Sequence, residues 1–379
     1  MEDIQMENTT TNKEAPIVST EDPREKLKVT KGKCKRLIKF ACLTILFQLL
    51  ISSVIASIVS SALLIPKLLN MDMSATPLSE IINMFLQSSM GLSSDEQMLT
   101  AAIAYVIANP LAAFLGLKMS RIGKIKPMFK GNKFNIFETV CACCAATGCS
   151  IVITLLSTLF SSFFAGSDSF LDGFINGGIA SSAWGTVVTV LYVCILGPIT
   201  EEILCRGAVL RISSPVGKVC AIVLSSVLFG FMHGNYTQMI NATLMGLVFG
   251  YVAIKSESLI VPCIMHIFNN SISTILSVIA MKLTEKQAWV MNIVFEIVIG
   301  ILGILGLIYL IKKHGKITKN DKVEVNEVVS AEAVEELKAS NKGFSLKVVL
   351  TCPIFWIVFV YCNYLAILIA SGAMTNLTG

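Results

Sequence analysis

Six side chains capable of acid–base chemistry or anion binding stand within or beside apolar stretches of this sequence. They are Glu201, Glu202, Arg206, His233, His266 and Asn270. An ionisable group inside a membrane-spanning segment is costly, so each such group is a functional candidate by default. Because all six lie between residues 198 and 270, we expect one chemically active site in this part of the chain.

The first cluster contains two adjacent glutamates and an arginine. Glu202 and Arg206 are four residues apart and share a helix face, so they can pair. Glu201 is rotated by about 100° from that face, which leaves its carboxylate free for general acid or base work in a cavity. We expect Pro198 to bend the helix and open that cavity. The alternative is an ordinary surface ion pair where the helix emerges into water.

Two of the three histidines of the chain follow this cluster in apolar segments. Phe229 and His233 share one helix face, and His266 and Asn270 share another. Polar groups within a membrane must find partners in the absence of water, so we expect these groups to meet the glutamates. The alternatives are a structural histidine at a helix end and an asparagine that only joins two helices.

Two kinds of chemistry are compatible with one glutamate, two histidines and an amide. Glu201, His233 and His266 could bind a divalent metal such as zinc, which would activate a water molecule. Without a metal, Glu201 could act as the general base while His and Asn donors stabilise an oxyanion. Both routes predict water-dependent cleavage of an acyl bond.

Three motifs carry a resemblance to a known family, and they lie within residues 184–280. Glu201-Glu202-x-x-x-Arg206, Phe229-x-x-x-His233 and His266-x-x-x-Asn270 resemble, in order and approximate spacing, the motifs of the CPBP family. This family comprises CAAX proteases and bacteriocin-processing enzymes and is also called the Abi family. The resemblance implies an all-helical intramembrane endopeptidase that acts on a membrane-associated peptide or protein, lipidated in the CAAX-type relatives.

The resemblance also implies a role for each residue. Glu201 would activate the attacking water with the help of His233, and His266 and Asn270 would bind the scissile carbonyl. Glu202 and Arg206, with Phe229, would support the site. Family members are often described as metalloproteases, and a metal-free glutamate mechanism is equally compatible with these residues. A non-proteolytic immunity or partner-binding protein of the same family stays open, and a transporter is less favoured because no internal repeat is visible.

The composition explains how such residues come to be in a membrane. The chain has 379 residues, of which 54% are hydrophobic and only 15% charged, whereas soluble chains have about 25% charged residues. Runs long enough to span a bilayer predict an all-α, polytopic transmembrane bundle of about nine spans. These lie near 38–65, 98–117, 136–164, 184–205, 218–233, 238–254, 258–281, 288–311 and 347–371.

Loop charges predict the orientation of these spans. The N-terminal tail and the loops after the second and eighth spans are rich in Lys and Arg, which favours a cytoplasmic N-terminus. The net charge of +5 is spread over these loops, so nucleic-acid binding is not expected. The predicted location is a bacterial cell membrane. His314, in the loop after the eighth span, is expected to be solvated.

The predicted organisation divides the chain into six parts, with a short surface helix expected between Glu324 and Glu336. The parts are a disordered cytoplasmic tail (1–35), N-terminal transmembrane helices (36–183), the protease core (184–281), a transmembrane helix (282–311), a polar cytoplasmic loop (312–346) and a C-terminal transmembrane helix (347–379).

Overall fold

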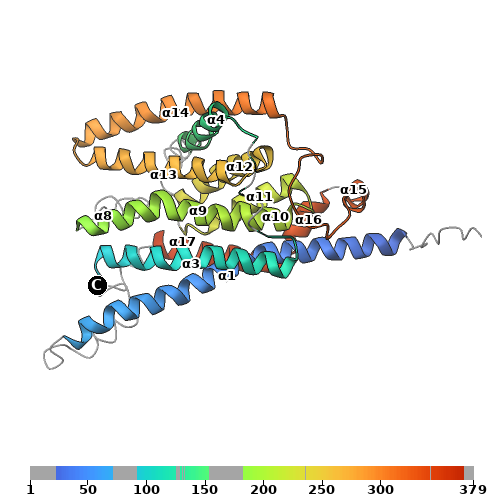
Figure 1. The fold of residues 1–379 in the computed structure, drawn as a ribbon, viewed down its shortest axis with the longest axis horizontal. Coiled ribbons are helices and arrows are strands. Elements are labelled where there is room, and N and C mark those ends of the chain that lie inside the picture. The colour runs from blue at the N-terminus through green and yellow to red at the C-terminus, as the bar shows by residue number, and fades with distance from the viewer. Residues whose placement is uncertain are drawn as a thin grey trace, which may run out of the picture.

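The computed structural model describes residues 23–70, 92–124, 129, 131, 133–152, 182–234, 236–341 and 343–370. Every element within these residues is a helix, which confirms the predicted all-α class (Figure 1). The elements are α1 (Pro23–Leu69), α3 (Ser94–Ser120), α4 (Ile136–Thr147), α8 (Ala183–Val190), η2 (Leu191–Leu196), α9 (Gly197–Glu202), η3 (Ile203–Leu210), α10 (Arg211–Ser213), α11 (Lys218–Phe231), α12 (Tyr236–Ser256), α13 (Ile260–Ala280), α14 (Glu285–His314), α15 (Ala331–Ser340), α16 (Phe344–Leu350) and α17 (Pro353–Ala370).

Six helical segments of the described chain are long and apolar enough to cross a membrane. A seventh is formed if α16 and α17, which meet at a bend of 60°, are one broken span. The apolar segment at α4 and helix α11 are too short for this test, so the count of nine spans stays a prediction. The six segments are Arg24–Leu69, Ser94–Ser120, Ala183–Ser213, Gln238–Ser256, Ile260–Ala280 and Glu285–His314.

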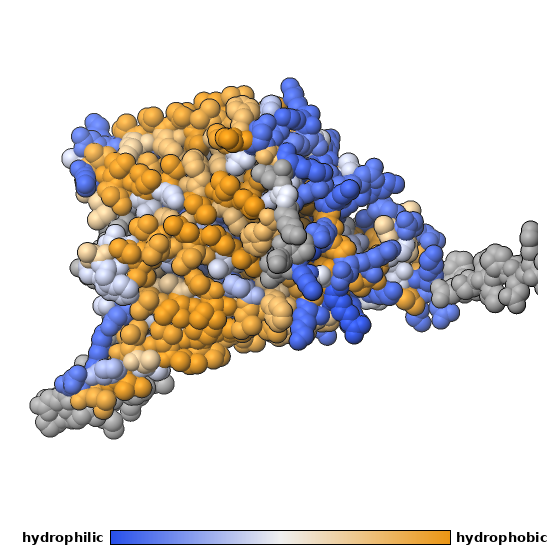
Figure 2. Space-filling view, in the orientation of Figure 1, coloured by the Kyte–Doolittle hydropathy of each residue, from blue (hydrophilic) through white to orange (hydrophobic). Residues whose placement is uncertain are grey.

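A broad hydrophobic band covers the face of the molecule shown in Figure 2, and hydrophilic residues gather at the end near α15 and α16. Apolar side chains of α14 such as Ile301 and Leu305 expose more than half of their surface. Exposed apolar area costs about 25 cal/mol per Å² in water, and lipid removes that cost. The band therefore fits the hydrocarbon layer of a bilayer.

The first helix begins earlier than the sequence predicted. Residues 1–22 of the predicted disordered tail lie outside the described residues, but α1 starts at Pro23 and includes residues 23–35. Proline is preorganised for the first helical position, and Glu25 in the first turn complements the helix dipole. The predicted boundary at residue 35 is therefore wrong for the described part of the tail.

The Ala183–Ser213 segment lies between α3 on one side and α13 on the other (Figure 1). It consists of α8, η2, α9, η3 and α10 in unbroken succession, and η2 and η3 are π-helical. Single π turns inside α-helices are uncommon and often mark functional sites. Here they flank α9, which carries Glu201 and Glu202 at its end.

Helix α11 resolves how His233 can approach the other polar residues. It has 14 residues, and at about 1.5 Å per residue it is about 21 Å long. The chain enters it through Gly217, whose φ of 158° falls in a region that L side chains rarely adopt. His233 follows the end of this short helix, where the Phe229 ring contacts both His233 and His266 of α13.

The polar segment after α14 is attached to the ends of several core helices. Arg211 of α10 donates to the carbonyl of Glu324, Lys255 of α12 pairs with Asp321 at 2.7 Å, and the Asn326 N–H donates to Ile122 O at 2.7 Å. The segment includes the expected surface helix, which is α15. We call residues 315–330 the strap, because these bonds hold it across the bundle.

His314 is not simply solvated, as the sequence suggested. Its Nε2 lies 2.9 Å from Glu138 Oε1 of α4, and its ring stacks on Phe134 with centroids 4.5 Å apart. The expectation failed because Glu138 is far from His314 in the sequence, and only the packing of α4 on α14 brings the two together.

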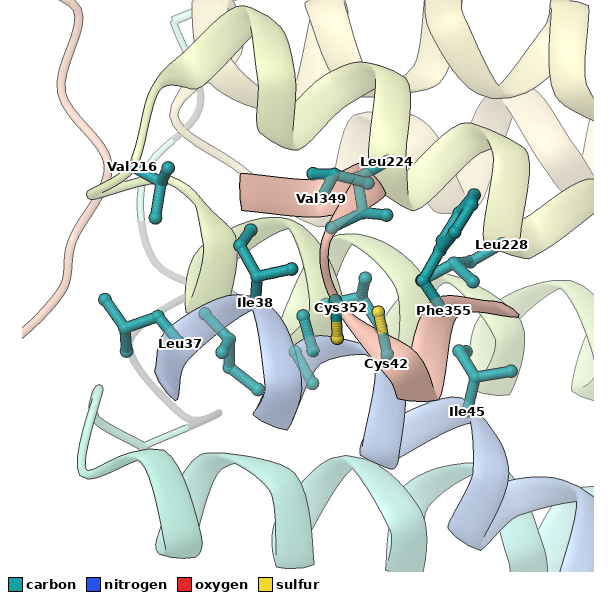
Figure 3. Packing of buried hydrophobic residues seen from close by; sticks show 14 of the residues in the cluster. Leu37, Ile38, Cys42, Ile45, Val216, Leu224, Leu228, Val349, Cys352 and Phe355 are labelled. Atoms are coloured by element: carbon teal, nitrogen blue, oxygen red, sulfur yellow. The ribbon is translucent and has the colours of Figure 1, made fainter. Parts of the chain in front are cut away.

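The largest group of buried apolar residues joins α1 to the C-terminal helices. Ile38, Cys42 and Ile45 of α1 face Val349, Cys352 and Phe355 from the region of the α16–α17 bend, with Leu224 and Leu228 of α11 alongside (Figure 3). Helices α1 and α17 therefore pack on one another, and α16 and α17 pack on α11.

Candidate active site

The centre of the candidate site is a buried ion pair. Arg206 Nη1 lies 2.7 Å from Glu202 Oε1, and neither side chain is exposed to solvent. Arg206 Nη2 also donates to Gly246 O of α12 at 3.2 Å. Charges removed from water need close, hydrogen-bonded partners. Glu202 Oε1 and both terminal nitrogens of Arg206 have them, whereas Glu202 Oε2 and Arg206 Nε are buried without a hydrogen-bond partner.

Two aromatic rings complete the surroundings of the arginine. The guanidinium carbon of Arg206 lies 4.7 Å from the ring centroid of Phe229 and 5.0 Å from that of Phe249. Aromatic faces attract cations, and more strongly when water is excluded. Arg206 is thus held by a carboxylate, a carbonyl and two rings, which makes it a fixed cation rather than a mobile side chain.

His266 connects this buried pair to Glu201. Its Nδ1 lies 3.1 Å from Glu202 Oε1, and its Nε2 lies 3.7 Å from Glu201 Oε2. The His266 side chain is 4% exposed and that of Glu201 is 20% exposed. The sequence predicted Glu201 to be the free carboxylate and Glu202 the anchored one, and the structure arranges the two glutamates in that way.

The hydrogen bond to Glu202 determines which nitrogen of His266 carries a proton. A carboxylate paired with arginine only accepts, so His266 Nδ1 must donate. In the neutral ring Nε2 is then an acceptor, and it lies 3.7 Å from Glu201 Oε2. Two acceptors at this separation suit a water molecule that donates one proton to each.

His233 also contacts the Phe229 ring. Its Nδ1 is 2.9 Å from Phe229 O, and because a carbonyl only accepts, Nδ1 carries a proton here as well. Phe229 makes edge contacts with both imidazoles, at 5.0 Å to His233 and 5.6 Å to His266. Phe229 therefore sets the spacing of the two histidines, and the hydrogen-bonding partner of His233 is Phe229 rather than Glu201.

Asn270 lies one turn after His266 on α13 and bonds to the main chain of η2. Its Nδ2 donates to Val193 O at 2.9 Å, and its Oδ1 accepts from Asn269 at 3.1 Å. An amide nitrogen has two N–H donors, so one remains for a substrate carbonyl. The predicted carbonyl-binding role of Asn270 stays a prediction.

The three residues predicted as metal ligands do not converge. His266 and Glu201 are close, but His233 is hydrogen-bonded to Phe229 O and forms no described ion pair with Glu201, and His266 Nδ1 is bound to Glu202. In the described part of the chain no three His, Cys, Asp or Glu side chains form a set that could hold a metal ion. The donor set therefore does not fit a zinc site, and the mechanism below uses no metal.

Sequence reasoning missed three residues that hold the site together. Gly246 and Phe249 of α12 contact Arg206, and Val193 of η2 binds Asn270. A Cβ on Gly246 would come within 3.0 Å of Arg206 Nη2 and within 2.9 Å of the Ser226 Cβ. Nothing in a single sequence distinguishes these apolar residues from others that face lipid. Gly246 and Val193 act through their main-chain carbonyls, which every residue has.

Comparison with known proteins gives one family match, in the segment that carries these site residues. Residues 183–272 match the family model described as type II CAAX prenyl endopeptidase, Rce1-like. The match includes all seven residues of the three motifs and confirms their resemblance to the CPBP family. Searches of curated proteins and of solved structures found no match.

Proposed function

Because residues 183–272 match the CAAX-type intramembrane proteases, we propose that this protein is an intramembrane endopeptidase whose catalytic pair is Glu201 and His266. Its substrate is a membrane-associated peptide or protein. By the family description, that substrate is a prenylated C-terminus of the CAAX type.

One observation carries the proposal: a buried series of polar and charged groups ends at a partly exposed carboxylate. Arg206 holds Glu202, Glu202 holds His266, and His266 Nε2 faces Glu201 at 3.7 Å. Groups fixed in advance act on a transition state without the cost of reorganising. A helix-joining ion pair would not need the additional, partly exposed glutamate beside it.

In the proposed mechanism Glu201 removes a proton from the water held between it and His266. The resulting hydroxide attacks the scissile carbonyl, and its π bond opens to an oxyanion. Glu201 then gives the proton to the leaving amine as the carbon–nitrogen bond breaks. We propose the second N–H of Asn270 as the donor to this oxyanion.

The orientation follows from the charge distribution. The start of α1, the end of α3 and the strap lie at the hydrophilic end of the molecule (Figures 1 and 2). Lys and Arg concentrate there, and short basic segments stay on the cytoplasmic side of membranes. We therefore propose that the N-terminus is cytoplasmic.

The decisive variant is Glu201→Gln, which keeps the shape of the side chain and removes its basicity. With the full-length protein in vesicles and a farnesylated CAAX peptide, we expect at least a 10²-fold loss of cleavage, in the range that general base catalysis contributes. Product is measured by mass spectrometry. The matched control is Glu285→Gln at the exposed start of α14, which should cleave normally.

Two results would contradict the proposal. Correctly inserted Glu201→Gln protein that retains cleavage within a few-fold of the parent would remove Glu201 from catalysis. Absence of any cleaved product from the parent protein, with solute flux into the same vesicles, would favour a transporter.

A further inference from the structure

We propose that Pro198 is a positioning residue that ties the Glu201 helix to the His266 helix through Val193 and Asn270. The effect on catalysis rests on the proposed function, whereas the tie itself does not. Pro198 is four residues from Glu202 and touches neither histidine in any described contact, so its role would be indirect.

The π-helical pattern of η2 explains why Pro198 matters. The Gly197 N–H donates to Tyr192 O, five residues earlier. The next donor in this series would be the amide of residue 198, and its acceptor would be Val193 O. Proline has no N–H, so Val193 O cannot receive that bond. A main-chain carbonyl within a membrane still needs a donor.

Asn270 supplies the donor from another helix. Its Nδ2 donates to Val193 O at 2.9 Å. Neighbouring polar groups also link η2 to α13. Thr274 Oγ1 donates to Asn270 O at 2.8 Å, and Cys194 Sγ lies 3.4 Å from Thr274 Oγ1. The side chain of Asn270 in α13 thus supplies the donor that Pro198 lacks. Val193 O is therefore bonded to α13 and not to a main-chain donor of its own helix.

This bond is one of two that bracket Glu201 between the same pair of helices, in addition to the Cys194–Thr274 contact. The other is Glu202 to His266, at 3.1 Å. Two connections, one on each side of Glu201 along its helix, restrict both sliding and rotation. The spacing of Glu201 and His266 depends on these motions, and displacements of about 1 Å can cost about 10²-fold in rate.

The first experiment measures the tie without any substrate. Thr274→Cys places a thiol opposite the native Cys194, and the yield of the Cys194 to residue-274 disulfide under copper–phenanthroline oxidation reports the spacing of the helices. Peptide mass spectrometry separates this pair from the other cysteines. Adding Pro198→Ala provides Val193 O with a main-chain donor, so we expect a lower yield. Pro110→Ala in α3 is the matched control and should leave the yield unchanged.

The second experiment is a double-mutant cycle on thermal unfolding in detergent. Asn270→Ala leaves Val193 O without a donor and should lower the Tm. Pro198→Ala alone should not lower it, and Pro198→Ala combined with Asn270→Ala should recover most of the loss. If the double variant is as unstable as Asn270→Ala, or if the crosslinking yield ignores Pro198→Ala, the proposal is overturned.

Peptide cleavage then connects the tie to catalysis. We expect Pro198→Ala to lower kcat by about tenfold or more with KM and Tm little changed, because the site is loosened and not lost. Unchanged kcat would overturn the positioning role. If the parent protein cleaves no CAAX peptide, the proposed function fails, but the crosslinking and unfolding results still decide whether the tie exists.

Discussion

At the scale of single residues, one carboxylate oxygen of Glu202 connects two other residues of the site. Glu202 Oε1 accepts from both Arg206 and His266. The carboxylate therefore neutralises a buried cation and fixes the tautomer of a histidine together. Glu202 therefore affects catalysis through the tautomer of His266. It affects the stability of the core by neutralising the charge of Arg206.

We expect Glu202→Gln to destabilise the protein by about 3–5 kcal/mol, because it leaves Arg206 buried without a counter-charge. Unfolding in detergent, followed by circular dichroism, measures this. The combined change Glu202→Leu with Arg206→Leu should cost less than the single change, since no charge is left buried. The control is Glu335→Gln, at the exposed pair with Lys338, which should change the free energy of unfolding little. A similarly small change in Glu202→Gln would show that the buried pair is not required for stability.

The geometry of Glu201, His233 and His266 also predicts the response to metal removal. Because these three side chains do not form a set that could hold a metal ion in the described part of the chain, we expect cleavage of the CAAX peptide to persist after dialysis against a zinc chelator. Activity and metal content are measured on the same sample. Loss of activity on chelation, with recovery when stoichiometric zinc is returned, would contradict the metal-free mechanism.

At the scale of elements, close helix packing depends on glycine where α14 meets α4. A Cβ at Gly303 would lie 2.6 Å from Cys144 O, and one at Gly306 would lie 2.7 Å from Cys141 O. Small residues let helices in membranes approach closely and gain van der Waals contact. This interface places α4 beside α12 and α13 in a second apolar cluster, on the side of the site opposite α1.

We expect Gly303→Ala to destabilise the protein by about 1–3 kcal/mol, the usual range for overpacking a close contact. The added methyl group meets main-chain atoms of α4, which cannot move aside as a flexible side chain would. The control is Gly32→Ala in α1, where nothing lies within 4 Å of the new Cβ. Thermal unfolding of the two variants side by side would refute the close-packing argument if Gly303→Ala were as stable as the control.

At the scale of the whole molecule, the strap joins helices that are far apart in the sequence. It bonds to α10 through Arg211 and to α12 through the Lys255–Asp321 pair. Burial alone would raise the pKa of Asp321, but the hydrogen bonds from Lys255 and from the Thr318 N–H outweigh it and hold that pKa below its ordinary value.

This lowered pKa predicts how attachment of the strap depends on pH. A carboxylate with a depressed folded pKa stabilises the folded state fully above its unfolded pKa of about 4 and loses that contribution as pH falls through the folded pKa. We expect acid-tolerant proteases to cut the strap faster below about pH 4 than at pH 6. In the Asp321→Asn variant, the rate of strap cleavage should rise less on acidification than in the parent protein. If the parent and the variant gave the same pH profile, Asp321 would not control the attachment.

The amino-acid sequence by itself determined the features that depend on composition and on local spacing. Hydrophobic runs specified a helical membrane protein, and the four-residue spacing of Glu202 and Arg206 specified their pairing, because a helix places such residues on one face. The same local logic left Glu201 free beside an anchored neighbour. The motif order was enough to indicate the family, since motifs are themselves features of the sequence.

Only the tertiary structure decided which groups meet across helices. It placed His266, and not His233, beside Glu201; it enclosed Arg206 between Phe229 and Phe249; and it gave Asn270 a main-chain carbonyl as partner. The physical reason is that these contacts depend on helix length, π turns and the closeness of packing between segments separated by tens of residues. Such quantities follow from the whole set of packed helices, and no local pattern encodes them.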